Sequence, residues 1–246
     1  MAMKTFITAF WLYTKDPARQ AGPELTSARS KIRDCFVAIG VYYISALVFS
    51  VLLAALAKLI THVYSINLLA VRDENIGTAV KGAYTLLIVA LLGPILEEAI
   101  FRLWLSFKKV HIFLSLMALS FVVLTKLDHS MLYSTKTDKA FLVRMASVLP
   151  ISCCLYLLFN LPFFRKKIDS YFRFLYWGSC VAFGLMHMSN FTPLKSTLLW
   201  AYPLLVLPQL TLGFILGYLR IKNGFFWALL VHCLVNLPGA FFYYFK

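Results

Sequence analysis

Residues 85–102 read TLLIVALLGPILEEAIFR, and this stretch decides the fold class of the chain. A mostly apolar run leads directly to two adjacent carboxylates, Glu97 and Glu98, and then to Arg102. Apolar runs of roughly 20 residues are typical of helices that cross a membrane. Carboxylates are costly inside such a helix, so each of them is a candidate functional residue.

The rest of the chain repeats this apolar character. Of its 246 residues, 61% are hydrophobic and 14% are charged, whereas soluble domains are about 45–50% apolar and about 25% charged. We therefore predict an all-α, polytopic transmembrane helical bundle of about seven spans, within a range of six to eight, around a polar intramembrane cavity. The predicted spans are approximately residues 35–60, 77–105, 111–124, 146–164, 174–188, 198–219 and 225–245.

The predicted domain organisation is simple. Residues 1–34 are expected to form a cytoplasmic tail in which Phe6–Tyr13 lies as an interfacial helix, and residues 35–246 form the transmembrane domain. The net charge is +14. With the N-terminus in the cytoplasm, most of the basic residues fall on the cytoplasmic side, as the positive-inside rule requires. We expect them to set the orientation and to contact anionic lipids, and we expect no nucleic-acid partner.

The two carboxylates are predicted to differ in role. Glu98 and Arg102 are four residues apart on one helical face and can form an ion pair. Glu97 points about 100° away and has no such local partner, which makes it the candidate working carboxylate. The preceding Gly93-Pro94 pair is expected to kink the helix and shape the cavity.

Two further apolar segments carry histidines at similar depth. His187 follows Phe183 by one turn, and His232 precedes Asn236 by one turn. At 1.5 Å per residue, Glu97, His187 and His232 lie roughly 16, 21 and 15 Å from the nearest basic boundary residue. Side chains at one depth can converge on one cavity. A carboxylate base, an imidazole that holds water, and donors to an oxyanion together form a hydrolytic set.

These residues resemble the signature motifs of a known family, the CPBP (Abi) intramembrane proteases, which are relatives of the type II CAAX prenyl endopeptidase. The resemblance covers about residues 91–239. It is carried by Glu97-Glu98-x-x-x-Arg102, Phe183-x-x-x-His187 and His232-x-x-x-Asn236.

The resemblance implies an intramembrane endopeptidase that acts on a protein or peptide in or at the membrane. Glu97 would activate water with help from His187, while His232 and Asn236 would stabilise the oxyanion. Glu98, Arg102 and Phe183 would be supporting residues. No cofactor is favoured. A zinc site with Glu97, His187 and His232 as ligands is the alternative, since one carboxylate and two imidazoles match a catalytic zinc set.

Two features depart from the family pattern. The separation between Arg102 and His187 is unusually long, because two apolar blocks are inserted there, and Leu103 replaces a glycine. Other function classes also remain open: an inert immunity or scaffolding membrane protein, or a transporter. The expected location is the plasma membrane in a bacterium or the endoplasmic reticulum in a eukaryote.

Overall fold

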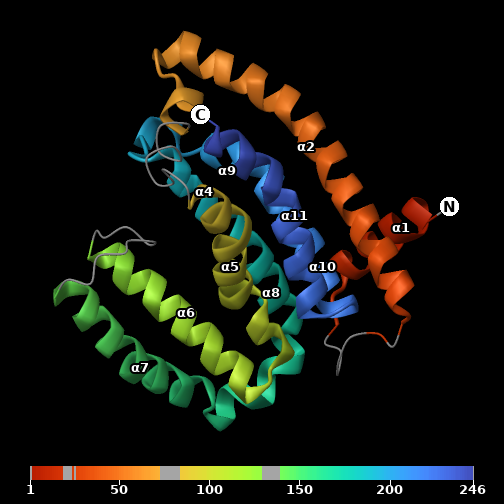
Figure 1. Cartoon of the computed structure of the whole chain (residues 1–246), viewed down its shortest axis with the longest axis vertical. Coiled ribbons are helices and arrows are strands. Elements are labelled where there is room, and N and C mark those ends of the chain that lie inside the picture. Colours follow the sequence, from red (N-terminus) through yellow and green to blue (C-terminus); the bar gives the residue numbers. More distant parts are fainter. Residues whose placement is uncertain (1, 19–23, 25, 73–83, 129–138, 246) are drawn as a thin grey trace.

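The computed structural model describes residues 2–18, 24, 26–72, 84–128 and 139–245. The described part of the chain is 87% helical and contains no strand. Figure 1 shows the helices side by side, with α6 and α7 as a hairpin at one edge and α2 along the opposite edge. The predicted all-α class is therefore confirmed.

The N-terminal half contains long helices joined by several short helical segments. In chain order they are α1 (Ala2–Lys15), α2 (Ala28–Tyr64), α4 (Thr85–Leu87), the π-helix η1 (Ile88–Leu92), α5 (Gly93–Phe101), the 3₁₀-helix η2 (Leu103–Ser106) and α6 (Lys109–Leu127).

The C-terminal half completes the bundle. It contains α7 (Lys139–Phe159), α8 (Pro162–Met186), the 3₁₀-helices η3 (His187–Phe191) and η4 (Ser196–Leu198), α9 (Tyr202–Leu205), α10 (Leu207–Lys222) and α11 (Phe225–Tyr244).

The N-terminal helix α1 packs onto the bundle with one face. The ring centroids of Phe6 and Phe10 lie 5.4 and 5.7 Å from that of Tyr218 on α10, and Trp177 Nε1 donates to the carbonyl of Thr14 at 2.8 Å. The opposite face of α1 keeps Trp11 57% exposed. The helix thus has one face in the core and an aromatic face available to a membrane interface.

Helix α2 begins at Ala28, earlier than the predicted residue 35. The Ser27 hydroxyl caps its first turn by accepting from Ser30 N–H at 3.3 Å. This serine cap stabilises the helix start, although it lies in a polar stretch where no span was expected. The first turns of α2 also contact the end of α10, where Asp34 pairs with Lys222 at 3.0 Å.

The boundary between the predicted fourth and fifth spans is wrong. Residues 162–164 belong to α8, not to the block that ends at residue 164. Leu161 precedes Pro162 and adopts an extended conformation with ψ 139°, as steric contact with a proline ring demands. Helix α8 therefore starts well before the predicted residue 174. Its basic residues lower the hydropathy of these turns without breaking the helix.

The predicted sixth span is divided. Residues 198–219 fall into η4, α9 and α10, and Val206 at the α9–α10 junction has non-helical angles of −103° and 15°. Pro203 and Pro208 stand in the first turns of the two helices, where proline is tolerated because its missing N–H has no intrahelical partner.

Helix α10 is the centre of the bundle, packed against α8, α11 and α2. Gly213 and Gly217 allow α8 to come close: a Cβ atom at Gly213 would lie 2.6 Å from the carbonyl oxygen of Cys180, and one at Gly217 would lie 2.7 Å from its Sγ. Nearly every side chain on the last turns of α10 is buried, Arg220 included.

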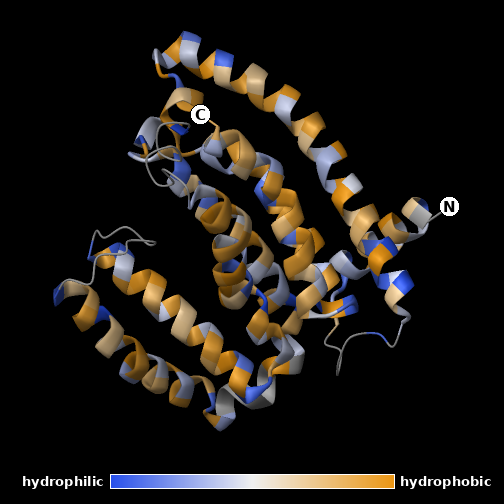
Figure 2. Cartoon of the chain, in the orientation of Figure 1, coloured by the Kyte–Doolittle hydropathy of each residue, from blue (hydrophilic) through white to orange (hydrophobic). Residues whose placement is uncertain are grey.

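Four described helices are long and apolar enough to cross a membrane: α2, α6, α7 and α11. Figure 2 shows that hydrophobic residues predominate along these helices. Most residues of these helices face outward, as lipid contact requires. The chain is an integral membrane protein, and the count of seven spans remains a prediction. Residues 77–83 of the predicted second span lie outside the described residues.

Candidate active site

The centre of the site is a buried ion pair at the C-terminal end of α5. Arg102 Nη1 lies 2.9 Å from Glu98 Oε1, and both side chains are completely buried. The same carboxylate oxygen lies 2.9 Å from His232 Nδ1 on α11. The predicted Glu98–Arg102 pair is confirmed. A carboxylate oxygen only accepts, so His232 presents its Nδ1 hydrogen to Glu98, and Nε2 is the ring atom that faces away.

Glu97 lies on the other side of this imidazole. Its Oε2 is 3.6 Å from His232 Nε2, and its side chain is 23% exposed. Oε2 itself has no hydrogen-bond partner in the described part of the chain. The two neighbouring glutamates therefore flank one histidine: Glu98 fixes the ring through Nδ1, and Glu97 faces Nε2 with an oxygen available to another group.

Phe183 of α8 joins the three motifs. Its ring lies 3.8 Å beneath the Arg102 guanidinium, a cation–π distance. The rings of His187 and His232 stand edge-on to it, with centroids at 5.1 and 5.5 Å. The phenylalanine that precedes His187 by one turn is thus the common neighbour of all three polar side chains.

His187 stands where α8 ends and the 3₁₀-helix η3 begins. Its Nδ1 lies 3.0 Å from the carbonyl oxygen of Phe183. A carbonyl only accepts, so Nδ1 carries the hydrogen and Nε2 is left with a lone pair that can accept from water. The inserted hairpin does not separate the motifs, because α6 and α7 lie at one edge (Figure 1) while α8 packs directly on α5.

Asn236 lies one turn after His232 on α11, as predicted. Its Nδ2 donates to the carbonyl oxygen of Val89 at 3.2 Å. Val89 belongs to the π-helix η1, immediately before α5. Every predicted site residue therefore lies in α5 or at its C-cap, in α11, or at the junction of α8 and η3.

Three contacts that sequence reasoning missed support Arg102 and the end of α5. Arg102 Nη2 donates to the Gly213 carbonyl at 3.3 Å, Arg220 Nε donates to the Arg102 carbonyl at 3.1 Å, and Ser179 Oγ donates to the Phe101 carbonyl. Arg220 carried no signal of this role. A basic residue in the last turn of an apolar helix usually indicates an anchor at the membrane interface, but Arg220 is only 7% exposed.

The zinc alternative, with Glu97, His187 and His232 as ligands, remains a prediction. Among the described residues, no group of three or more His, Cys, Asp or Glu side chains is placed to hold a metal ion. His232 Nδ1 is bonded to Glu98, so Nε2 is the ring nitrogen that this histidine could offer to a metal.

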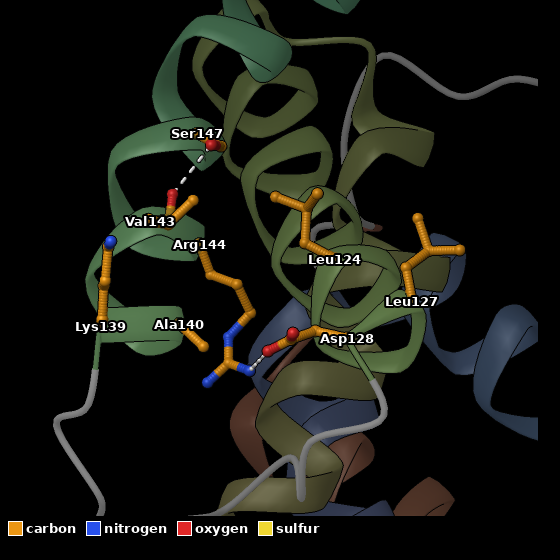
Figure 3. Close-up of a pocket in the computed structure, with 8 residues that line it drawn as sticks. All are labelled: Leu124, Leu127, Asp128, Lys139, Ala140, Val143, Arg144 and Ser147. Atoms are coloured by element: carbon orange, nitrogen blue, oxygen red, sulfur yellow. Dashed lines mark hydrogen bonds and ion pairs between the residues drawn. The ribbon is translucent and has the colours of Figure 1, made fainter.

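A cavity of about 640 Å³ lies away from these residues, between the end of α6 and the start of α7. Figure 3 shows Arg144 crossing it to Asp128, with an Nη1–Oδ2 distance of 2.5 Å. The cavity does not touch the motif residues, so the predicted polar cavity around Glu97 remains a prediction.

Comparison with known proteins places the motifs in a family. A family model described as "Type II CAAX prenyl endopeptidase Rce1-like" matches residues 79–238, which is more than half of the chain and includes all three motifs. Comparison with individual curated proteins and with solved structures finds no match. The match agrees with the resemblance carried by the Glu-Glu, Phe-His and His-Asn motifs, and the chain belongs to the Rce1-like family of type II CAAX prenyl endopeptidases.

Proposed function

We propose that this protein is an intramembrane endopeptidase that hydrolyses a peptide bond of a membrane-associated or lipidated protein, with Glu97 activating the attacking water. The observation that carries the proposal is the division of roles between two adjacent carboxylates. Glu98 is buried and bonded to Arg102 and His232. Oε2 of each glutamate lacks a hydrogen-bond partner in the described part of the chain, so the difference lies in exposure: the Glu97 side chain is 23% exposed, whereas that of Glu98 is completely buried.

The proposed reaction needs only the side chains of the three motifs. Glu97 accepts a proton from water while the lone pair of His187 Nε2 holds the second hydrogen. The water oxygen attacks the carbonyl carbon, and the oxyanion accepts from Asn236 Nδ2–H and from His232 Nε2–H when that ring carries both hydrogens. The carbon–nitrogen bond then breaks, and Glu97 returns the proton to the leaving amine.

The family suggests a substrate class. Proteins with a C-terminal Cys-aliphatic-aliphatic-X sequence receive a prenyl group on the cysteine, and the matched family is described as a CAAX prenyl endopeptidase. We therefore propose a prenylated C-terminus as the substrate to test first. A prenyl chain enters the bilayer readily, which would bring the scissile bond to membrane depth.

The proposal is tested with purified protein in liposomes and a farnesylated peptide that ends in such a sequence. Mass spectrometry should detect loss of the last three residues. Glu97→Gln should lower kcat about 10²- to 10⁴-fold, the usual contribution of a general base. Its unfolding temperature should match that of the unsubstituted protein. Full activity of this variant would contradict the proposed mechanism.

The same assay separates the metal-independent mechanism from the zinc alternative. Activity should persist in excess chelator. Loss on chelation with recovery on adding zinc would favour the metal version.

A peptide of the wrong substrate class would not be cleaved. Comparing membrane proteomes of cells with the unsubstituted protein and with Glu97→Gln then identifies other substrates. If the two proteomes are identical, the inert scaffolding alternative is favoured over an enzyme.

A further inference from the structure

The helix that carries Glu97 contains a π turn directly before α5. In η1, the Gly93 N–H donates to the carbonyl of Ile88, five residues back rather than four. Pro94 follows at once. Single π turns of this kind are rare and occur frequently at functional sites. Here the turn has a specific consequence for one main-chain carbonyl.

That carbonyl belongs to Val89. An α-helical donor to it would come from Gly93, whose N–H is already bonded to Ile88. A π-helical donor would come from residue 94, which is a proline and has no N–H. A carbonyl deprived of both donors is costly within an apolar bundle unless another group supplies a hydrogen bond. Asn236 supplies it, with Nδ2 at 3.2 Å from the Val89 oxygen.

This bond fixes which way the Asn236 amide faces. A main-chain carbonyl cannot donate, so the amide must turn Nδ2 toward Val89 and Oδ1 away. One of the two Nδ2 hydrogens is then used, and the other remains available. The amide of α11 is thereby held by the main chain of the helix that carries Glu97, four residues after His232 on the same helical face.

We propose that Pro94 is a positioning residue, which acts by keeping the Val89 carbonyl available to Asn236. The proposal rests on the proposed function in so far as Asn236 donates to the oxyanion. Pro94 and the π turn then set the orientation of that donor relative to Glu97, although neither touches the substrate. The hydrogen bond from Asn236 to the Val89 carbonyl thus links the third motif to the helix that carries the first motif.

The test is Pro94→Ala, assayed with the farnesylated peptide in liposomes. Alanine restores an N–H that can bond to Val89 in the π turn, or allows the turn to become α-helical so that Gly93 bonds to Val89. Either change competes with Asn236. Removing a proline from a helix does not weaken its backbone bonding, so the unfolding temperature should not fall.

We expect kcat to fall about 10- to 100-fold, the scale of a misplaced catalytic group, while KM stays within about twofold. The matched control is Pro150→Ala in α7, a proline inside a helix that is exposed and lies in the hairpin away from the site. It should leave kcat and KM unchanged. A kcat for Pro94→Ala equal to that of the control would overturn the inference.

A double mutant separates this route from a shift in Glu97 itself, since changing a π turn also rotates the residues after it. Asn236→Ala alone should lower kcat about 10²- to 10³-fold. Adding Pro94→Ala should cause no further loss if Pro94 acts through Asn236. If the fold-losses in kcat of the two single variants multiply in the double mutant, Pro94 acts on Glu97 instead, and the inference is overturned.

The proposed function and this inference fail in different ways. A fully active Glu97→Gln variant contradicts the proposed role of Glu97 as the base. If Glu97→Gln is inactive and the losses of Pro94→Ala and Asn236→Ala multiply in the double mutant, only the role assigned to Pro94 is removed. Full activity of Asn236→Ala would remove the roles of both Asn236 and Pro94 and leave Glu97 as the base.

Discussion

Glu97 and Glu98 share one sequence context but lie in different environments. Glu98 is enclosed by Arg102 and His232, while Glu97 is partly open. Side chains at consecutive helix positions point about 100° apart, so two neighbours can face a packed core and a reaction space respectively. A structural carboxylate and a reactive carboxylate can thus be adjacent in the chain.

This difference predicts opposite effects on stability. Glu98→Gln leaves the Arg102 guanidinium buried without a compensating charge, and removing one partner of a buried pair costs about 3–5 kcal/mol. Glu97→Gln removes no such pair and should change stability by less than about 1 kcal/mol. Thermal or denaturant unfolding in the same detergent measures both. Equal destabilisation of the two variants would contradict the assigned environments.

At the scale of the elements, the close approach of α8 and α10 holds the supporting residues in register. Gly213 lies opposite Cys180 and Phe183, and its own carbonyl accepts from Arg102. The same glycine therefore serves helix packing and the arginine that pairs with Glu98. A side chain there would push apart the two helices on which Phe183 and Arg102 depend.

Gly213→Ala tests this packing. The new Cβ would lie 2.6 Å from the Cys180 carbonyl oxygen and 3.2 Å from Phe183 Cδ1. We expect a loss of about 1–3 kcal/mol from overpacking and a fall in kcat as Phe183 shifts. Gly178→Ala is the matched control on α8, because a Cβ there meets no atom within 4 Å. It should raise stability by up to about 1 kcal/mol through helix propensity.

An unfolding temperature for Gly213→Ala equal to or above that of the Gly178 control would show that the α8–α10 contact can relax at no cost.

At the scale of the whole molecule, the membrane sets the orientation of the bundle. Helix α6 runs from Lys109 to Leu127, which corresponds to about 28 Å and matches the hydrocarbon thickness. Lys108 and Lys126 are both exposed at its opposite ends. The distribution of basic residues along the chain predicts that the Lys108 end faces the cytoplasm.

Cysteine labelling tests this orientation. Lys108→Cys should react with a membrane-impermeant maleimide only from the cytoplasmic side, and Lys126→Cys only from the opposite side. The control is the unsubstituted chain, whose five cysteines lie in helices and should react little. Labelling of both positions from one side would show that α6 does not cross the membrane.

The sequence by itself determined the fold class and the motif residues. Long apolar blocks can be stable only as helices in lipid, because every backbone group must be bonded within its own segment. The spacing of Glu98 and Arg102 determined their pairing, since residues four apart on a helix are neighbours. These are local or compositional rules, so they can be read without a structure. Helix ends at Pro162 and Ser27 also had local causes, although hydropathy alone concealed them.

Only the tertiary structure decided which groups from different helices meet. Glu98 bonds His232, Arg220 supports the end of α5, and Asn236 faces Val89. None of these contacts follows from spacing, because each depends on the relative rotation and depth of packed helices. The π turn before Pro94 is the clearest case. The proline indicates an irregular helix, but the Val89 carbonyl, which has no donor in its own helix, acquires a partner only when α11 packs beside it.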